Sequence, residues 1–147
     1  MPKATLGEAV SRYIAYLALA VVVVVFGVLA PDRFLTLGNL GVGLQNAAVL
    51  CIVAIGITFI IIGGSIDLSV GSMMALSGAV AASLTPQFNA WAFLAAPLVG
   101  AALGAVNGSV FVYGRIPSFV VTLGMLSVAR GLTVLFSGGR PVPIPFT

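Results

Sequence analysis

The chain has 147 residues, of which 61% are hydrophobic and only 6% are charged. Soluble domains carry about 25% charged residues, so this composition excludes a soluble enzyme and indicates a chain that lies in lipid. At about 20 residues per helical crossing, five crossings use most of the length. We therefore expect residues 1–147 to form a single membrane-embedded domain with no second, soluble domain.

The charged residues give a formal net charge of +3, from six Lys and Arg against three Asp and Glu. They are scattered along the chain, so no basic stripe indicates nucleic-acid binding. The chain has no His and one cysteine, Cys51, which leaves no disulfide framework, no zinc site and no Cys–His nucleophile pair. We expect no catalytic residue, metal site or cofactor, and we interpret Cys51 as a small buried apolar residue.

Charge-free intervals predict the membrane crossings, because a charge at the centre of a membrane helix is costly. The five predicted crossings are Tyr13–Pro31, Leu40–Ile62, Ser69–Leu84, about Trp91–Phe111 and Pro117–Phe136. The predicted fold class is therefore all-α, a polytopic helical membrane protein. We interpret the first crossing as an uncleaved anchor rather than a signal peptide, because its apolar segment exceeds the usual length of about 7 to 15 residues.

Glycine, proline and polar clusters separate the predicted crossings. Gly63-Gly64-Ser65 forms a Gly-rich break before the third crossing, and the cluster Thr85–Asn89 divides the third crossing from the fourth. Trp91 fits an interfacial anchor. The prolines at 141, 143 and 145 predict a non-helical tail.

The distribution of positive charges predicts the orientation in the membrane. An amino terminus in the cytoplasm places Lys3, Arg12 and Arg115 on the cytoplasmic side, against Arg33 and Arg140 outside. We therefore expect the amino terminus in the cytoplasm and the tail after Arg140 outside.

Small residues at four-residue spacing predict close helix packing, since helices in lipid associate through tight contacts between small side chains. The rows are Gly71, Ala75 and Ala79 in the third crossing, and Gly100, Gly104 and Gly108 in the fourth. We expect both rows to pack within one polypeptide, with a glycine-driven homodimer as the alternative. Replacing Gly104 by Leu is then expected to force the fourth crossing away from its neighbour.

The most unusual polar segment runs from Gly63 to Ser72 and brings a carboxylate and hydroxyls to the start of the third crossing. A broken helix at membrane depth is tolerated where it is buried in protein or lines a water-filled cavity. One interpretation is that Asp67, Ser69 and Ser72 line a solute pathway. The other is that Asp67 caps the third crossing by accepting backbone N–H groups two or three residues on. The two interpretations are compatible.

Further polar side chains within the predicted crossings are Gln45, Asn46, Asn107 and Arg130. An intramembrane arginine is a functional-site candidate, although Arg130 lies about 9 Å from the outer end of its helix and can also snorkel. The three amides can bind a polar solute or form interhelical hydrogen bonds. All four residues are candidates for a translocation path.

The segment from Gly64 to Gly78, GSIDLSVGSMMALSG, closely resembles the hallmark segment of ribose-type sugar importer permeases of the ATP-binding-cassette class. A second block resembles the next segment of that family at the expected distance. It comprises Asn107-Gly108, Arg115–Met125, Ala129–Leu132 and Ser137–Pro141. The resemblance covers about Asn39 to Ile144.

The resemblance implies a multi-pass permease subunit of the bacterial inner membrane that performs no bond chemistry itself. Its partners would be cytoplasmic ATPase subunits, a second permease copy or related chain, and a periplasmic sugar-binding protein. A monosaccharide would cross by alternating access. Family members have about twice this length, so we expect the chain to be an amino-terminal half, without the later segment that engages the ATPase.

Three alternatives stay open beside the sugar permease. The first is a permease of the same superfamily that carries branched-chain amino acids or a sugar-like signal. The second is a small self-associating channel, and the third is a non-transporting membrane scaffold or remnant.

Overall fold

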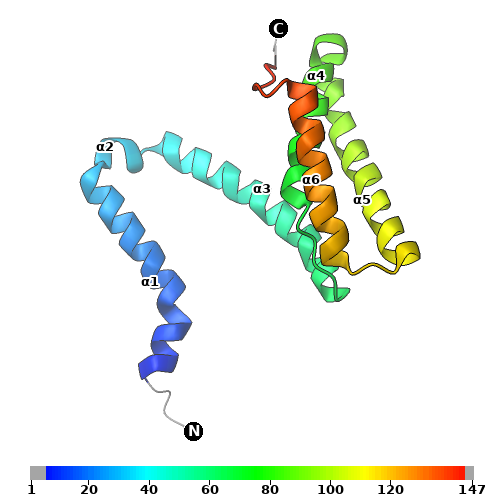
Figure 1. Ribbon diagram of the computed structural model, residues 1–147. Helices are drawn as coiled ribbons and strands as arrows, with labels where there is room; N and C mark the ends of the chain where they lie inside the picture. Colours follow the sequence, from blue (N-terminus) through cyan, green and yellow to red (C-terminus); the bar gives the residue numbers. More distant parts are fainter. Residues whose placement is uncertain (1–5, 145–147) are drawn as a thin grey trace. The chain divides into compact units, whose positions relative to one another are not determined.

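The structure is a computed structural model that describes residues 6–144, with side chains from residue 13 onward. Every regular element in this part of the chain is helical (Figure 1). The elements are α1 (Leu6–Leu29), α2 (Pro31–Phe34), α3 (Leu37–Ile62), α4 (Val70–Phe88), the 3₁₀ helix η1 (Asn89–Leu94), α5 (Ala95–Gly114) and α6 (Ser118–Ser137). The predicted all-α fold class is confirmed.

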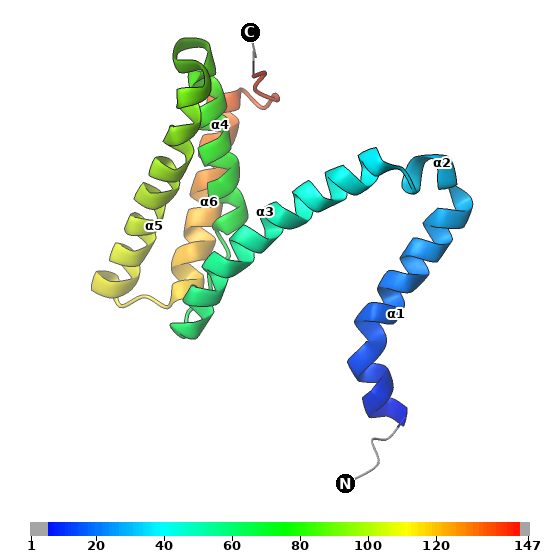
Figure 2. The ribbon, with the colours of Figure 1, turned by 180° about the vertical axis from the view of Figure 1, so that it is seen from behind.

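Three helical stretches are long and apolar enough to cross a membrane, namely Leu37–Ile62, Val70–Gly114 and Ser118–Ser137, and Tyr13–Leu29 is a shorter apolar helix. The stretch Val70–Gly114 reverses direction at η1, so α4 and α5 lie side by side in both ribbon views (Figures 1 and 2). Two of the predicted crossings therefore correspond to separate antiparallel helices.

The cluster Thr85–Asn89 was predicted to separate two crossings, but all of it except Asn89 lies on helix α4, which continues through Pro86 to Phe88. Proline has no N–H to donate to the carbonyl four residues earlier. That carbonyl, on Ala82, accepts a hydrogen bond of 2.7 Å from the Thr85 hydroxyl instead. Because the buried carbonyl still has a donor, the helix tolerates the proline in its last turn.

The chain forms two compact units that meet within α3, between Ile52 and Val53. In the first unit, α1 contacts the short helix α2, and the rings of Phe26 and Phe34 have centroids 5.8 Å apart. Cys51 was expected to be buried and is exposed. The reason is that α3 has no buried residue, so the described chain does not cover its apolar side chains.

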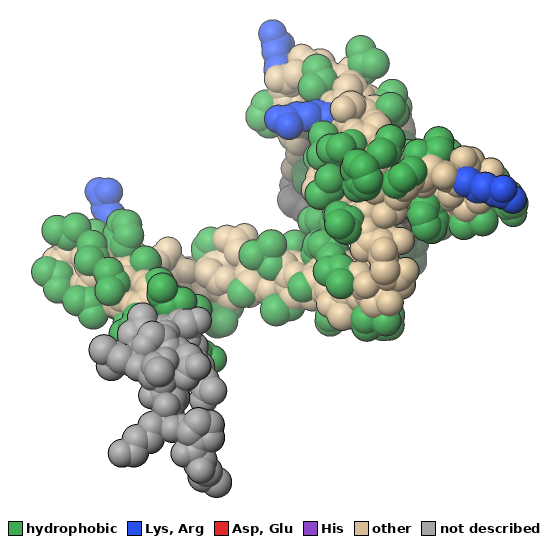
Figure 3. Space-filling model, turned by 60° about the horizontal axis from the view of Figure 1, so that its bottom comes forward, with side chains coloured by type: hydrophobic (Ala, Val, Ile, Leu, Met, Phe, Trp, Pro, Cys, Tyr) green, Lys and Arg blue, Asp and Glu red, His purple; other side chains and the backbone are tan. Residues whose placement is uncertain are grey.

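The second unit is a three-helix packing in which α4 contacts both α5 and α6 (Figure 2). Half of the buried residues in the described part of the chain are polar, and the apolar ones are mostly alanine. They are Leu76, Ala81, Ala82, Ala92 and Ala129, and Ser69, Ser77, Thr85, Asn107 and Thr122. Large apolar side chains are exposed instead, and Figure 3 shows them over much of the visible surface. Such a distribution suits helices whose solvent is lipid.

The three glycines of the row on α5, Gly100, Gly104 and Gly108, do not all face helix α4. A Cβ at Gly100 would lie 3.7 Å from the Ser77 hydroxyl of α4, but a Cβ at Gly104 or Gly108 would meet no atom within 4 Å. Four residues advance an α-helix about 40° beyond a full turn, so the later glycines rotate away from α4. The side of α5 that contacts α4 continues to Asn107, and the packing expected at Gly104 is wrong within this chain.

The ends of α6 agree with the predicted boundaries. Pro117 is the residue before the helix, and Gly138 adopts a left-handed conformation with φ of 61° after it. Residues 141–144 are non-helical as predicted, while residue 145 lies outside the described residues. Lys3 and the side chain of Arg12, on which the predicted orientation partly rests, also lie outside them.

Topology can be measured by cysteine accessibility in a Cys51→Ala background. With the amino terminus in the cytoplasm, Gln87→Cys is expected to react with an impermeant thiol reagent from the periplasm and Ser118→Cys to be protected. The structure places Gln87 and Ser118 at opposite ends of helix α4. Gln87 lies in its last turn, and Ser118 bonds to Ile66 just before its first residue. The reverse labelling pattern would invert the orientation.

Helix packing can be tested at two glycines of the same row. Gly100→Leu is expected to displace Ser77 and to destabilise the α4–α5 contact by about 1 to 3 kcal/mol. Gly104→Leu is the matched control and is expected to leave the melting temperature of the purified chain in detergent unchanged. Equal losses in the two variants would contradict the assignment of the contact to Gly100.

Candidate functional site

The break between α3 and α4 begins with a glycine-dependent helix end. Gly64 has a φ of +73°, a conformation that other residues rarely adopt. Its N–H donates to the Ile61 carbonyl at 2.9 Å, and the Ser65 N–H donates to the Ile60 carbonyl at 3.1 Å. This pair of bonds is the Schellman pattern, which satisfies the last carbonyls of a helix. The Ile60 and Ile61 carbonyls therefore keep hydrogen-bond donors where the chain leaves α3.

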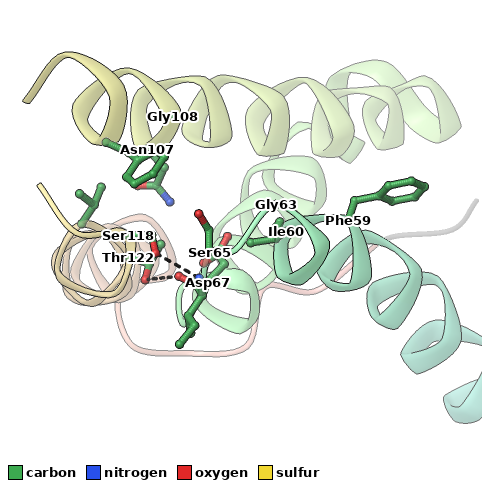
Figure 4. A pocket seen from close by; sticks show the side chains of 12 residues that line it. Phe59, Ile60, Gly63, Ser65, Asp67, Asn107, Gly108, Ser118 and Thr122 are labelled. Atoms are coloured by element: carbon green, nitrogen blue, oxygen red, sulfur yellow. Dashed lines mark hydrogen bonds between the residues drawn. The ribbon is translucent and has the colours of Figure 1, made fainter. Parts of the chain in front are cut away.

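The next residue of the break, Ile66, is held by two hydroxyls of α6. The Ile66 N–H donates to the Ser118 hydroxyl oxygen at 3.1 Å. The single proton of the Thr122 hydroxyl is shared between the Ile66 carbonyl and the Phe119 carbonyl of α6, each at 3.3 Å. Ser118 and Thr122 are one helical turn apart, so they lie on the same side of α6. Figure 4 shows both pointing toward the break. Backbone that is outside any helix thus gains both of its partners from a neighbouring helix.

The carboxylate of Asp67 organises the start of α4. Its Oδ1 accepts the Ser69 N–H at 2.7 Å and the Ser69 hydroxyl at 2.6 Å. Ser69 is the residue that directly precedes α4, so Asp67 lies two positions before the cap. The sequence-based expectation that Asp67 accepts an N–H two residues on is confirmed, while the cap position itself belongs to Ser69. The Ser69 carbonyl accepts from the Ser72 hydroxyl at 2.8 Å and from the Met73 N–H at 2.9 Å.

Asn107 connects α5 to this arrangement. Its Nδ2 donates to the Ser69 hydroxyl oxygen at 3.1 Å, and the single hydroxyl proton of Ser69 then serves Asp67. The side chain is 8% exposed, and its Oδ1 has no hydrogen-bond partner. Helix α5, the capping serine and the carboxylate therefore form one polar chain with a free acceptor at its end.

A cavity of about 290 Å³ lies at the break (Figure 4). Its polar lining comprises Ser65, Asp67, Asn107, Ser118 and Thr122, and the rest comprises Phe59, Ile60, Gly63, Ile66, Gly108, Phe111 and Val121. Asp67 is the one charged residue in this lining. The site therefore offers hydrogen-bonding oxygens beside aromatic and aliphatic walls, a chemistry that suits binding rather than catalysis.

The structure brings together only some of the sequence-predicted site residues. Asp67 and Asn107 line the cavity, and Ser69 is fully buried behind it. Ser72 and Arg130 line a separate hollow of about 480 Å³ between α4 and α6, together with Gly71 and Ala75. Gln45 and Asn46 belong to the first unit, where both are exposed on α3. Among the described residues, no group of three or more His, Cys, Asp or Glu side chains could hold a metal ion.

Sequence reasoning missed the three hydroxyl residues Ser65, Ser118 and Thr122 as site residues. The four-residue spacing of Ser118 and Thr122 at the start of an apolar helix was the available signal. Serine and threonine in membrane helices commonly bond to their own backbone, so the spacing does not identify a partner 50 or more positions away in sequence.

The hydrogen bond between α6 and the break can be tested by replacing Ser118. Ser118→Ala removes the acceptor for the Ile66 N–H, so hydrogen exchange at that amide, measured by NMR, is expected to rise about three- to tenfold. Ser127→Ala is the control, because the Ser127 hydroxyl donates only to the Leu123 carbonyl within α6. Unchanged exchange at Ile66 in Ser118→Ala would mean that this bond does not hold the segment.

Comparison with known proteins finds relatives over most of the chain. The ribose import permease protein RbsC of Escherichia coli strain K12 is 44% identical over 133 residues, which are 89% of this chain and 41% of that protein. The RbsC of Haemophilus influenzae is 35% identical over 136 residues, 90% of this chain and 42% of that protein. The D-allose transport system permease protein AlsC of Escherichia coli strain K12 is 37% identical over 135 residues, 89% of this chain and 41% of that protein.

The chain spans about two fifths of the length of these curated relatives. No solved structure matches it. The family described as "Branched-chain amino acid transport system / permease component" matches residues 39–141, which include the break, the cavity and all of α4 to α6. The chain is an all-α multi-pass membrane protein, and it belongs to this permease family.

Proposed function

We propose that the chain forms part of the transmembrane permease subunit of an ATP-binding-cassette importer in the bacterial inner membrane. The cavity at the break contributes to the path of a monosaccharide that a periplasmic binding protein delivers. A cytoplasmic ATPase pair supplies the energy, and a second permease copy or related chain completes the membrane part. The permease itself changes no covalent bond.

The observation that carries this proposal is the 44% identity over 133 residues to a ribose import permease. Relatives named for allose and xylose import extend the support from ribose to monosaccharides in general. The cavity supports it chemically, because hydroxyl, amide and carboxylate oxygens can accept the hydroxyl protons of a sugar. Weak polar contacts also suit a path that must release what it binds.

A second candidate substrate is a branched-chain amino acid, which the description of the matching family favours. The two candidates differ in the solute that the cell accumulates. A competition measurement with leucine, ribose and xylose therefore decides between them.

The proposal is tested by replacing the matching segment of the Escherichia coli ribose permease with this chain. Cells that lack their own ribose permease are expected to take up radiolabelled ribose or another pentose or hexose through the chimera. The uptake has to depend on the host's binding protein and ATPase. A chimera that is present in the membrane and accumulates leucine, or accumulates neither solute, would refute sugar import by this segment.

Asp67→Asn in the same chimera tests the site. Asparagine keeps an oxygen that can accept the Ser69 N–H, so the structural loss is limited to about 0.3 to 1 kcal/mol of charge–dipole energy. A hydrogen bond to a charged acceptor contributes about 1.5 to 3 kcal/mol, so uptake is expected to fall about tenfold or more with protein abundance unchanged.

Asp32→Asn is the matched control for this loss, because Asp32 is an exposed carboxylate on α2. Its uptake is expected to equal that of the unchanged chimera. Normal uptake in Asp67→Asn, combined with failed assembly in Asp67→Ala, would limit Asp67 to the structural role at the start of α4.

A further inference from the structure

The hollow of about 480 Å³ between α4 and α6 has an unbalanced charge. Arg130 is the one charged residue in its lining, which contains no carboxylate. The two hydroxyls of the lining direct their protons to nearby backbone. Ser72 donates to the Ser69 carbonyl at 2.8 Å, and Thr133 donates to the carbonyl four residues earlier at 2.7 Å. No group of the lining therefore carries a charge opposite to that of the guanidinium.

Arg130 lies well inside α6, a helix that is long and apolar enough to cross a membrane. Twelve residues separate it from Ser118 at the start and seven from Ser137 at the end, which correspond to about 18 and 10 Å. A guanidinium keeps its charge, and a charged side chain at such a depth is costly unless it is paired. Since the described chain places no carboxylate in the hollow, the opposite charge has to come from outside it.

The walls of the hollow suit a further helix. On α4 the wall includes Gly71 and Ala75, both exposed, and a Cβ at Gly71 would meet no atom within 4 Å. On α6 the lining runs from Leu126 to Val134, about 12 Å or two helical turns. Small residues in a membrane allow another helix to approach closely. The hollow is therefore long enough and open enough for two turns of such a helix.

The chemistry of Arg130 restricts which helix can enter. A carboxylate matches the guanidinium with two parallel hydrogen bonds. A second copy of this chain does not supply one within a crossing, because the three acidic residues of the sequence all lie outside the predicted crossings. They are Glu8, Asp32 and Asp67. A lipid phosphate lies at the membrane surface, whereas the hollow extends from Arg130 to Leu68 beside the break.

We propose that the hollow between α4 and α6 is the docking surface for a membrane helix of a further permease segment, and that a carboxylate on this helix pairs with Arg130. The source of the helix rests on the proposed function, in which further permease segments complete the membrane part. About three fifths of the length of the Escherichia coli ribose permease lies outside the part that matches this chain. Arg130 is then a helix-contact residue rather than part of a solute path.

The test expresses the affinity-tagged chain together with a separate polypeptide, the part of the Escherichia coli ribose permease outside the matched segment. The chain is expected to retain that polypeptide in mild detergent. Arg130→Gln is expected to lower the retained amount about tenfold or more, the loss of hydrogen bonds between charged groups. Arg140→Gln is the matched control and is expected to retain it fully, because Arg140 follows α6 and does not line the hollow.

An exchange of charges identifies the partner group. Arg130→Glu is expected to abolish retention, and an Asp→Lys or Glu→Lys substitution at one position in an apolar segment of the other polypeptide is expected to restore it. No retention by the unchanged chain, equal retention by Arg130→Gln, or no restoration by any such exchange would overturn the ion pair.

Thermal unfolding of the chain alone separates a partner helix from a lipid and controls for misfolding. In phosphatidylcholine nanodiscs, Arg130→Gln is expected to leave the Tm unchanged, because the hollow holds no partner of Arg130 from this chain. Added phosphatidylglycerol is expected to change the Tm of both forms equally. A rise in Tm with phosphatidylglycerol that Arg130→Gln abolishes would assign Arg130 to a lipid headgroup and overturn the docking surface.

The outcomes also separate this inference from the proposed function. Sugar uptake by the chimera, together with equal retention by Arg130→Gln, would refute the docking surface and leave sugar import standing. Retention that depends on Arg130 and is restored by a charge exchange, with no sugar uptake by the chimera, would support the docking surface and refute the import role.

Discussion

The need to satisfy backbone hydrogen bonds outside a helix governs the second unit of this protein. In an apolar chain that lies in lipid, an unpaired N–H or C=O costs several kcal/mol, so helices are interrupted only where other groups supply partners. At the break before α4, Gly64 turns the chain, Ser118 and Thr122 hold Ile66, and Asp67 holds Ser69. The same hydroxyls and carboxylate that complete the backbone also line the cavity, so structure and binding chemistry share their atoms.

Because Ser118 and Thr122 of α6 both bond to Ile66 and line the cavity, the shape of the cavity depends on the position of α6. Both contacts to Ile66 come from the first two turns of α6, so a displacement of those turns changes the backbone directly before Asp67. Such hydrogen bonds contribute about 0.5 to 1.5 kcal/mol each, which is small enough to be exchanged during a conformational cycle. In an importer that alternates between two states, this geometry would change the solute contacts when α6 moves.

The sequence allowed the helices and the break to be predicted, but only part of the site. The end of α3 at Ile62 and the start of α6 at Ser118 agree with the prediction because Gly and Pro act locally on the backbone. The bond from Ser69 to Asp67 was also predictable, since it spans two residues. The contact of Ser118 with Ile66 crosses 52 positions, and no local pattern specifies it. The even spacing that includes Gly104 was misleading, because a four-residue period drifts around a 3.6-residue helix.

The buried interior explains why a free acceptor can persist at Asn107. Packing among α4, α5 and α6 depends on alanine, serine and threonine, and Leu76 is the one large apolar residue among the buried ones in the described chain. Small residues let the helices approach closely, but they leave a cavity at the break between α3 and α4. An apolar residue at position 107 would remove the donor to the Ser69 hydroxyl. Asparagine anchors α5 to the cap of α4 through its Nδ2, while its Oδ1 stays buried without a hydrogen-bond partner in the described chain.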